Sequence, residues 1–184
     1  MGSHRAAVLF VQGGGEGTHD EWDNALVDSL RTGLGPGHEV RYPRMPYEGD
    51  PRYPRWSAAI GNEMARLDEG AVLAGHSIGG TILVQTLIDR PPERKLAAIV
   101  LIAAPFVGED GWPGDEFEFS GDLGDRLPPG VPVHVFHGDQ DETAPATHAM
   151  LYADAIPRAL VRVLAGRDHQ LSGDLSEVAL AIRG

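Results

Sequence analysis

Six short apolar runs recur along the chain. Each is rich in Val, Ile, Leu or Ala, and each is continuously apolar more than alternating, which is typical of strands in a parallel sheet covered on both faces. The pattern predicts strands at residues 6–12, 38–43, 71–76, 97–104, 132–137 and 159–164.

Stretches with helical spacing lie between these runs. In the first, Trp22, Leu26 and Leu30 recur four residues apart. They follow Thr18-x-x-Glu21, a pattern typical of a capping box at a helix start. Further helices are predicted at about 56–68, 78–89, 146–155 and 172–182. Because strand and helix alternate from end to end, we predict an α/β fold with a parallel sheet and right-handed crossovers.

Two segments depart from this rhythm. Residues 41–55 contain four prolines and three tyrosines, which predicts an ordered loop rather than a helix. Residues 107–130 are rich in Gly, Pro and acidic side chains. Both segments follow strands, and ligands of open parallel sheets bind at the carboxyl ends of strands, so both can overhang a site. The acidic part, 109–125, is most simply a solvated loop; the alternative is a short cap that disfavours anionic substrates.

The size and charge of the chain narrow the classes of protein. Its 184 residues, 42% of them apolar, suit one domain over residues 1–184. Residues 1–4 resemble a remnant of an expression tag, and we expect no role for them. A formal net charge of −12 without a basic cluster opposes nucleic acids and anionic membranes as partners. With no Cys, the chain has neither disulfides nor thiolate chemistry.

The apolar runs are too short for a membrane anchor. The longest, residues 96–107, falls well below the roughly 20 residues that span a bilayer, and no signal-peptide pattern opens the chain. We therefore expect a cytoplasmic protein, and leave its oligomeric state open.

The segment Gly-His-Ser-Ile-Gly-Gly at residues 75–80 follows the third predicted strand and opens a predicted helix. Gly-x-Ser-x-Gly in that setting is typical of a nucleophile elbow, a turn so tight that glycines flank the serine in space. The helix start offers amide protons, that of Ile78 first, to an oxyanion. The pattern alone also fits an inert serine on a Gly-rich turn, but its position favours Ser77 as a nucleophile.

A serine nucleophile needs partners, because its hydroxyl is unreactive at neutral pH. The partners are a histidine base and a carboxylate that orients it, in the order Ser, acid, His. The fifth apolar run ends in a segment that offers Asp139, Asp141 and Glu142. The sixth is followed by His169. Parallel strands end at one edge of the sheet, so we expect acid and base beside Ser77.

The spacing around these candidates carries a family resemblance. Gly138, Asp141 and Pro145 stand in the pattern Gly-x-x-Asp-x-x-x-Pro, and Gly166 precedes His169 by three residues. Both patterns are those of the α/β-hydrolase superfamily. The resemblance implies that Asp141, rather than its acidic neighbours, is the triad acid and that His169 is the base.

The resemblance extends over about residues 6–183. The chain looks like a compact member of the superfamily, similar to small bacterial serine hydrolases and, more loosely, to the serine-hydrolase family that includes a retinoblastoma-binding protein. It implies a three-layer α/β sandwich with a minimal cap. The six-stranded sheet is expected to be mainly parallel, in the order 2-1-3-4-5-6, with helices on both faces.

An oxyanion hole requires two amide donors. One is the residue after the nucleophile, Ile78, and the other comes from the loop after the first strand. That loop reads Gln12-Gly13-Gly14-Gly15, where many relatives carry His-Gly-x or His-Gly-Gly-Gly. The resemblance implies Gly14 as the donor, with Gly13 and Gly15 as alternatives in register. The replacement of the usual His by Gln12 leaves open how the loop is held.

Metal and nucleotide sites are less consistent with the sequence. His137, Asp139 and Asp141 place an imidazole and two carboxylates within five residues, but without an established ligand spacing. The glycines of 13–17 do not match Gly-x-Gly-x-x-Gly, and no Lys-Ser or Lys-Thr pair follows them. We therefore expect no metal and no cofactor.

The remaining histidines are expected to be structural. His76 adjoins the nucleophile, but successive residues at a strand end point apart, so a packing or supporting role is expected. His134 is expected to be a satisfied core residue. His19, His38 and His148 are expected at surface or loop positions.

These features predict an esterase-like or thioesterase-like serine hydrolase acting on a small-molecule acyl substrate through an acyl-enzyme. Met45, Tyr47, Trp112 and Phe117 could line an acyl pocket or simply pack. The alternatives are a catalytically idle binding protein of the same fold, and a perhydrolase or lyase that uses the same triad without a cofactor.

Overall fold

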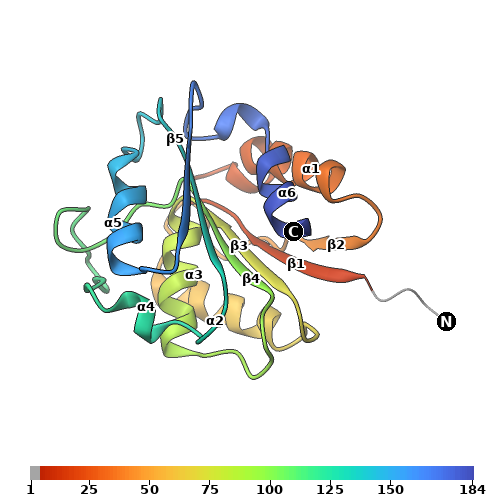
Figure 1. Ribbon diagram of the computed structural model, residues 1–184, viewed down its shortest axis with the longest axis horizontal. Helices are drawn as coiled ribbons and strands as arrows, with labels where there is room; N and C mark the ends of the chain where they lie inside the picture. Colours follow the sequence, from red (N-terminus) through yellow and green to blue (C-terminus); the bar gives the residue numbers. More distant parts are fainter. Residues whose placement is uncertain (1–4) are drawn as a thin grey trace.

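The computed structural model describes residues 5–184 as a six-stranded sheet between two layers of helices (Figure 1). Residues 1–4, the predicted tag remnant, lie outside the described residues. The strands are β1 (Ala6–Val11), β2 (His38–Arg41), β3 (Val72–His76), β4 (Ala98–Ile102), β5 (Val133–Gly138) and β6 (Leu160–Leu164). All neighbouring pairs are parallel, and the order is β2-β1-β3-β4-β5-β6. Both the strand predictions and the predicted order are confirmed.

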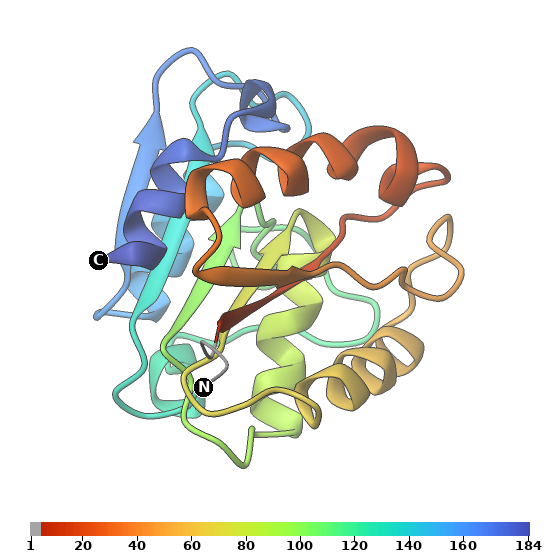
Figure 2. The ribbon, with the colours of Figure 1, turned by 90° about the vertical axis from the view of Figure 1, so that its right-hand side faces the viewer.

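Alternate residues of the central strands enter two separate cores. On β1, Leu9 and Val11 pack beneath the helices α2 (Tyr53–Met64), α3 (Ile78–Asp89) and α5 (Thr147–Ala155). Val8 and Phe10 face α1 (Asp23–Leu34) and α6 (Ser176–Arg183). Figures 1 and 2 show the two helical layers on opposite faces of the sheet. Side chains that alternate between two apolar layers explain why the runs are continuously apolar.

The two edge strands differ from the prediction of buried strands. Every residue of β3 and β4 is buried, whereas β2 has no buried residue and β6 exposes Leu160 and Val163. An edge strand has a neighbouring strand on one side only, so more of its surface remains in contact with solvent. The sequence pattern identified strands but not their positions within the sheet.

The start of the first helix also differs from the prediction. Residues Thr18–Trp22 form one π-helical turn, η1, and α1 follows from Asp23. No side chain caps either start, since the Thr18 hydroxyl donates instead to the carbonyl of Gly14. The predicted capping box is therefore wrong. Trp22, predicted on the buried face, is 59% exposed.

The helix after the proline-rich segment begins earlier than predicted. α2 starts at Tyr53, with Pro54 in its first turn, where a missing amide proton costs no helical hydrogen bond. The prediction of a loop over all of residues 41–55 is wrong for its last three residues. The predicted helices at 78–89 and 146–155 match α3 and α5 closely. The last helix, α6, begins at Ser176 rather than at residue 172, where the chain instead forms the short turn η2 (Leu171–Gly173). Neither η2 nor α4 (Leu123–Arg126) was predicted.

The parallel topology brings the carboxyl ends of all six strands to one edge. Ser77 follows β3, Asp141 lies in the loop after β5, and His169 lies in the loop after β6. Within residues 5–184, no helix combines the length and apolar character that crossing a membrane requires.

Candidate active site

Ser77 occupies a strained turn between β3 and α3. Its φ of 52° and ψ of −134° lie in a backbone region that residues other than glycine rarely adopt. The turn is held by the Ser77 amide, which donates to the carbonyl of Ile102 at 2.9 Å, and by the Ser77 carbonyl, which accepts from Gly80 at 2.9 Å. These contacts match the nucleophile elbow that the sequence predicts.

The glycines around Ser77 allow three backbone segments to meet. A Cβ on Gly75 would lie 2.5 Å from the Cα of Gly80. A Cβ on Gly79 would overlap the carbonyl oxygen of Gln12 in the loop after β1. The elbow and the β1 loop are therefore in direct backbone contact, which places that loop beside Ser77.

Ser77, His169 and Asp141 form a continuous hydrogen-bonded chain. The Ser77 Oγ lies 2.9 Å from His169 Nε2, and His169 Nδ1 lies 2.7 Å from Asp141 Oδ2. Ser77 is half-buried, the His169 side chain is 17% exposed, and the Asp141 side chain is fully buried. The chain of contacts therefore runs from the surface into the protein, with each group within proton-transfer distance of the next.

The Asp141 carboxylate is fully supplied with donors. Its Oδ1 accepts the amide protons of Thr143 at 2.9 Å and Ala144 at 2.8 Å. His137 Nε2 lies 3.2 Å from Oδ2 and 2.7 Å from the carbonyl of Ala144, so its single proton is shared between two acceptors. These donors fix the orientation of the carboxylate toward His169.

The neighbouring acids have other positions. Asp139 accepts the amide proton of Gly166 at 2.7 Å and thereby joins the loops after β5 and β6. Glu142 is exposed. Of the three acids left open by the spacing, Asp141 is the one in contact with His169.

The amides of the β1 loop have distinct partners. Gly13 donates to Asp23 Oδ2 at 2.7 Å, and Gly15 donates to the carbonyl of Glu48 at 2.7 Å. Among the hydrogen bonds of residues 5–184, the amide of Gly14 has no acceptor. Ile78 is the first residue of α3, so its amide has no acceptor within the helix. A Cβ on Gly14 would lie 3.0 Å from Cγ2 of Ile78, so these two residues are neighbours.

Gln12 and Glu48 hold the β1 loop in place. The buried Gln12 side chain donates to Glu48 Oε2 at 2.7 Å and accepts the amide proton of Met45 at 2.8 Å. Glu48 also accepts the amide protons of Gly17 and His19. Burial raises the pKa of Glu48, but these hydrogen bonds, led by that of Gln12, outweigh it and leave the pKa below its ordinary value. Gln12 thus joins the loop to residues 41–55, which answers how the loop is held without a histidine.

A second His–Asp pair, missed in the sequence, lies behind the first. His76 and Asp23 are both buried, and His76 Nδ1 lies 2.9 Å from Asp23 Oδ2. Asp23 occupies a position on the buried face of α1 together with Leu26, Val27 and Leu30. A carboxylate at such a position requires a partner, and this was the sequence signal that could have revealed the pair. The supporting role expected for His76 is consistent with these contacts.

Burial is the main cause that lowers the pKa of His169 below its ordinary value. The nearby His76 lowers this pKa further, while the hydrogen bond and charge of Asp141 raise it. A lowered pKa keeps the ring neutral at neutral pH, and a neutral Nε2 can accept the proton of Ser77.

Two predictions about the other histidines are wrong. His148, expected at a surface or loop position, is buried in α5, and its Nδ1 accepts the amide proton of Phe106 at 2.8 Å. His134, expected to be a satisfied core residue, is only partly buried, and its Nδ1 has no hydrogen-bond partner. Burial lowers the pKa of both histidines.

The four side chains suggested for an acyl pocket lie in different environments. Met45 is buried in the core, and Tyr47 is 74% exposed. Phe117 packs against Tyr53 with ring centroids 5.1 Å apart, so residues 107–130 contact α2. Trp112 is partly exposed, and its ring packs in a T-shaped arrangement with that of His148.

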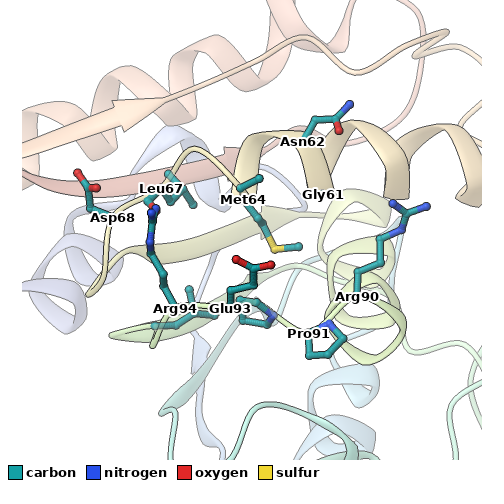
Figure 3. Close-up of a pocket in the computed structure, with 12 residues that line it drawn as sticks. Gly61, Asn62, Met64, Leu67, Asp68, Arg90, Pro91, Glu93 and Arg94 are labelled. Carbon is teal, nitrogen blue, oxygen red and sulfur yellow. The ribbon is translucent and has the colours of Figure 1, made fainter.

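A surface cavity at the other end of the sheet contains none of these groups (Figure 3). It lies between the end of α2 and the Pro91–Arg94 turn, with Met64 and Glu93 among its lining residues. Leu67 and Leu96 also line it and precede β3 and β4, so it adjoins the amino ends of the strands. Ligands of open α/β sheets bind at the carboxyl ends, where Ser77 lies. Within residues 5–184, no group of three His, Asp or Glu side chains is placed to hold a metal ion.

The sheet order and the elbow at the end of β3 are those of an α/β hydrolase. A family model described as "Serine hydrolase" matches residues 8–170, and the chain belongs to this family. A comparison with curated protein sequences found no match.

Solved structures of esterases share the fold. Est1E from Butyrivibrio proteoclasticus has a TM-score of 0.71 at 18% identity, over 99% of this chain and 87% of its own. The esterase RhEst1 from a Rhodococcus species has a TM-score of 0.77 at 15% identity, over 100% of this chain and 92% of its own. The carboxylesterase CesB from Bacillus subtilis has a TM-score of 0.66 at 14% identity, over 97% of this chain and 84% of its own. At such low identities the similarity shows the fold alone.

Proposed function

We propose that the protein cleaves a carboxylic ester or thioester of a small molecule, with Ser77 as nucleophile, His169 as general base and Asp141 as the acid that orients the base. The observation that carries this proposal is the hydrogen-bonded chain from Ser77 through His169 to Asp141. Membership in the serine hydrolase family supports it.

The proposed reaction has two halves. His169 Nε2 takes the Ser77 proton while Oγ attacks the acyl carbonyl carbon, and the same proton then passes to the departing alkoxide or thiolate. The acyl group remains on Ser77 as an ester. In the second half, His169 deprotonates a water that attacks this ester. The bond from the acyl carbon to Ser77 Oγ then breaks, His169 returns the proton to Oγ, and the carboxylic acid leaves. No cofactor enters either half.

The free amides of Gly14 and Ile78 are the proposed oxyanion donors. In acylation and again in deacylation, negative charge develops on the oxygen of the acyl carbonyl, and these two amides would donate to it. Gly13 and Gly15 are less suitable, because Asp23 and Glu48 already accept their protons. The dipole of α3, which starts at Ile78, adds a positive potential at the same point.

A small substrate is proposed from the packing of residues 107–130. Phe119, Leu123 and Leu127 of this segment are buried in the core beneath α3 and α5, so they are not available to enclose a long acyl chain. The net charge of −12 disfavours nucleic acids and anionic lipids as substrates. We propose a cytoplasmic location for this activity.

A fluorophosphonate probe tests the proposal, because it phosphonylates an activated serine and leaves an unactivated one unmodified. We expect the folded protein to label at one site, Ser77, and to hydrolyse p-nitrophenyl acetate, whereas Ser77→Ala does neither. Ser172→Ala is the matched control, since it removes a serine hydroxyl from another turn, and it should label as the unchanged protein does. A folded protein that does not label would indicate an idle binding protein, and faster turnover with added peroxide would indicate a perhydrolase.

A further inference from the structure

The buried pair of Asp23 and His76 joins four segments that meet behind Ser77. Asp23 comes from α1, and His76 is the last residue of β3, next to Ser77. Asp23 Oδ2 accepts the amide proton of Gly13 at 2.7 Å, which ties the pair to the β1 loop. His76 Nε2 lies 2.9 Å from the backbone carbonyl of His169, which ties it to the loop that carries the base.

The partners of His76 define its protonation. Both ring nitrogens face oxygen acceptors, a carboxylate at Nδ1 and a backbone carbonyl at Nε2. A carbonyl oxygen cannot donate, so Nε2 carries a proton. Asp23 Oδ2 already accepts from Gly13, and its Oδ1 faces Gln170 Nε2 at 3.4 Å, so the carboxyl group is surrounded by donors. The arrangement fits an imidazolium with two N–H donors beside an ionised carboxylate.

The electrostatic surroundings agree with this assignment. Burial is the largest influence on His76 and favours the neutral ring, but the charge and hydrogen bond of Asp23, together with the His169 carbonyl and Asp141, outweigh it and raise the pKa of His76. For Asp23, burial is again the largest influence and raises the pKa, but His76, Gly13 and Gln170 outweigh it and lower the pKa.

We propose that Asp23 and His76 are positioning residues of the hydrolase: a buried carboxylate–imidazolium pair that anchors the β1 loop and the His169 loop to the nucleophile strand and presents a fixed positive charge to the His169 ring. This inference rests on the proposed function for its catalytic part. The protonation of the pair is independent of that function.

The fixed charge acts on the base in a definite direction. The rings of His76 and His169 have centroids 5.1 Å apart. A cation at this distance opposes protonation of His169, while Asp141 on the other side favours it, and His137, which contacts Asp141, is the third ionisable group nearby. The pair therefore keeps His169 in its free-base form down to a lower pH than Asp141 alone would allow.

The protonation can be tested by nitrogen-15 NMR of the histidine rings in the Ser77→Ala protein, which removes turnover from the measurement. We expect His76, assigned by its loss in His76→Gln, to show two protonated nitrogens at pH 7.5. Asp23→Asn removes the counter-charge and should convert His76 to a singly protonated ring. A His76 ring that is neutral at pH 7.5 in the protein with Asp23 intact would overturn the proposal.

The effect on the base can be tested by the pH profile of p-nitrophenyl acetate hydrolysis. In Asp23→Asn and His76→Gln, we expect the acidic limb of kcat/KM to move to higher pH, because the cation no longer opposes protonation of His169. We also expect kcat at pH 8 to fall by about 10- to 100-fold, with KM changed little, since the loops lose their anchor to Ser77.

Asp28→Asn provides the matched control on the same helix, because Asp28 is exposed and its carboxylate pairs with Arg31 on the surface. It should retain the unchanged profile. Folded Asp23→Asn protein with an unshifted acidic limb would overturn the catalytic part, and this variant decides the question even if His76→Gln does not fold. Absence of activity and of probe labelling in the unchanged protein would instead refute the proposed function, while the NMR result would still decide the charge of the pair.

Discussion

At the scale of single residues, the orientation of His169 depends on the charge and acceptors of Asp141. In Asp141→Asn, an amide nitrogen replaces one carboxylate oxygen. The amides of Thr143 and Ala144 require an acceptor, so the oxygen stays with them and the new NH2 group faces His169 Nδ1. His169 must then accept at Nδ1 and carry its proton on Nε2, where it cannot take one from Ser77. We expect kcat to fall by about 1,000- to 10,000-fold, the loss typical of such a change in serine hydrolases.

The measurement is the kcat of p-nitrophenyl acetate hydrolysis, with folding checked by circular dichroism. Glu142→Gln makes the same chemical change one residue away on an exposed side chain, and it should leave kcat within about twofold. An Asp141→Asn protein with near-normal kcat would exclude Asp141 as the acid that orients His169.

Motif residues were easier to predict than residues defined by their partners. Ser77, Asp141 and His169 each belong to a local pattern of glycines and a strand end. By contrast, the role of Asp23 depends on its contact with His76, which lies more than fifty positions further along the chain, and no local sequence pattern predicts that contact. His148 was misassigned for the same reason, since the amide of Phe106 that it accepts comes from a distant loop.

At the scale of elements, the contact between α3 and the β1 loop depends on Gly79. Its Cβ would overlap the carbonyl oxygen of Gln12, a backbone atom that cannot rotate away. Gly79→Ala should therefore push the β1 loop, with the amide of Gly14, away from Ser77. We expect a loss of about 1–3 kcal/mol in the free energy of unfolding, as is usual for an overpacked core, and a fall in kcat through the displaced oxyanion donor.

Gly121→Ala is the matched control, because its added Cβ would have no atom of residues 5–184 within 4 Å apart from its immediate chain neighbours. Urea unfolding and ester kinetics of the two variants separate the contact from a general effect of replacing glycine. Equal stability and equal kcat for Gly79→Ala and the unchanged protein would contradict the role of this contact.

Element boundaries were predicted well where the core alone determines them. The runs of apolar residues end where the sheet ends, so all six strands were located to within two residues. The start of α1 was not predicted, because the Thr18 side chain bonds to Gly14 in the β1 loop rather than to its own helix. Helix starts that depend on a neighbouring loop are thus less visible in the sequence than buried strands.

At the scale of the whole molecule, the buried ionisable groups set the pH range of stability. The pKa values of His134 and His148 lie below the ordinary value of 6.5, chiefly through burial. The unfolded chain therefore binds more protons than the folded one just below pH 6.5, and stability decreases as the pH falls through that range. His76, whose pKa is raised, has the opposite sign: its contribution is present below pH 6.5 and is lost as the pH rises through its folded pKa.

The contribution of His148 can be isolated by His148→Asn, whose side-chain oxygen can still accept the amide proton of Phe106. The variant has no titratable group at position 148, so the decrease in melting temperature between pH 7.5 and pH 5.5 should be smaller than in the unchanged protein, even if the variant melts lower at pH 7.5. Asp28→Asn, on the exposed face of α1, should retain the full decrease. If the melting temperature of His148→Asn decreases between pH 7.5 and pH 5.5 by as much as that of the unchanged protein, His148 is not a source of the acid sensitivity. A smaller slope would show that its burial as a neutral ring, which the sequence did not predict, contributes to the stability of the whole fold at neutral pH.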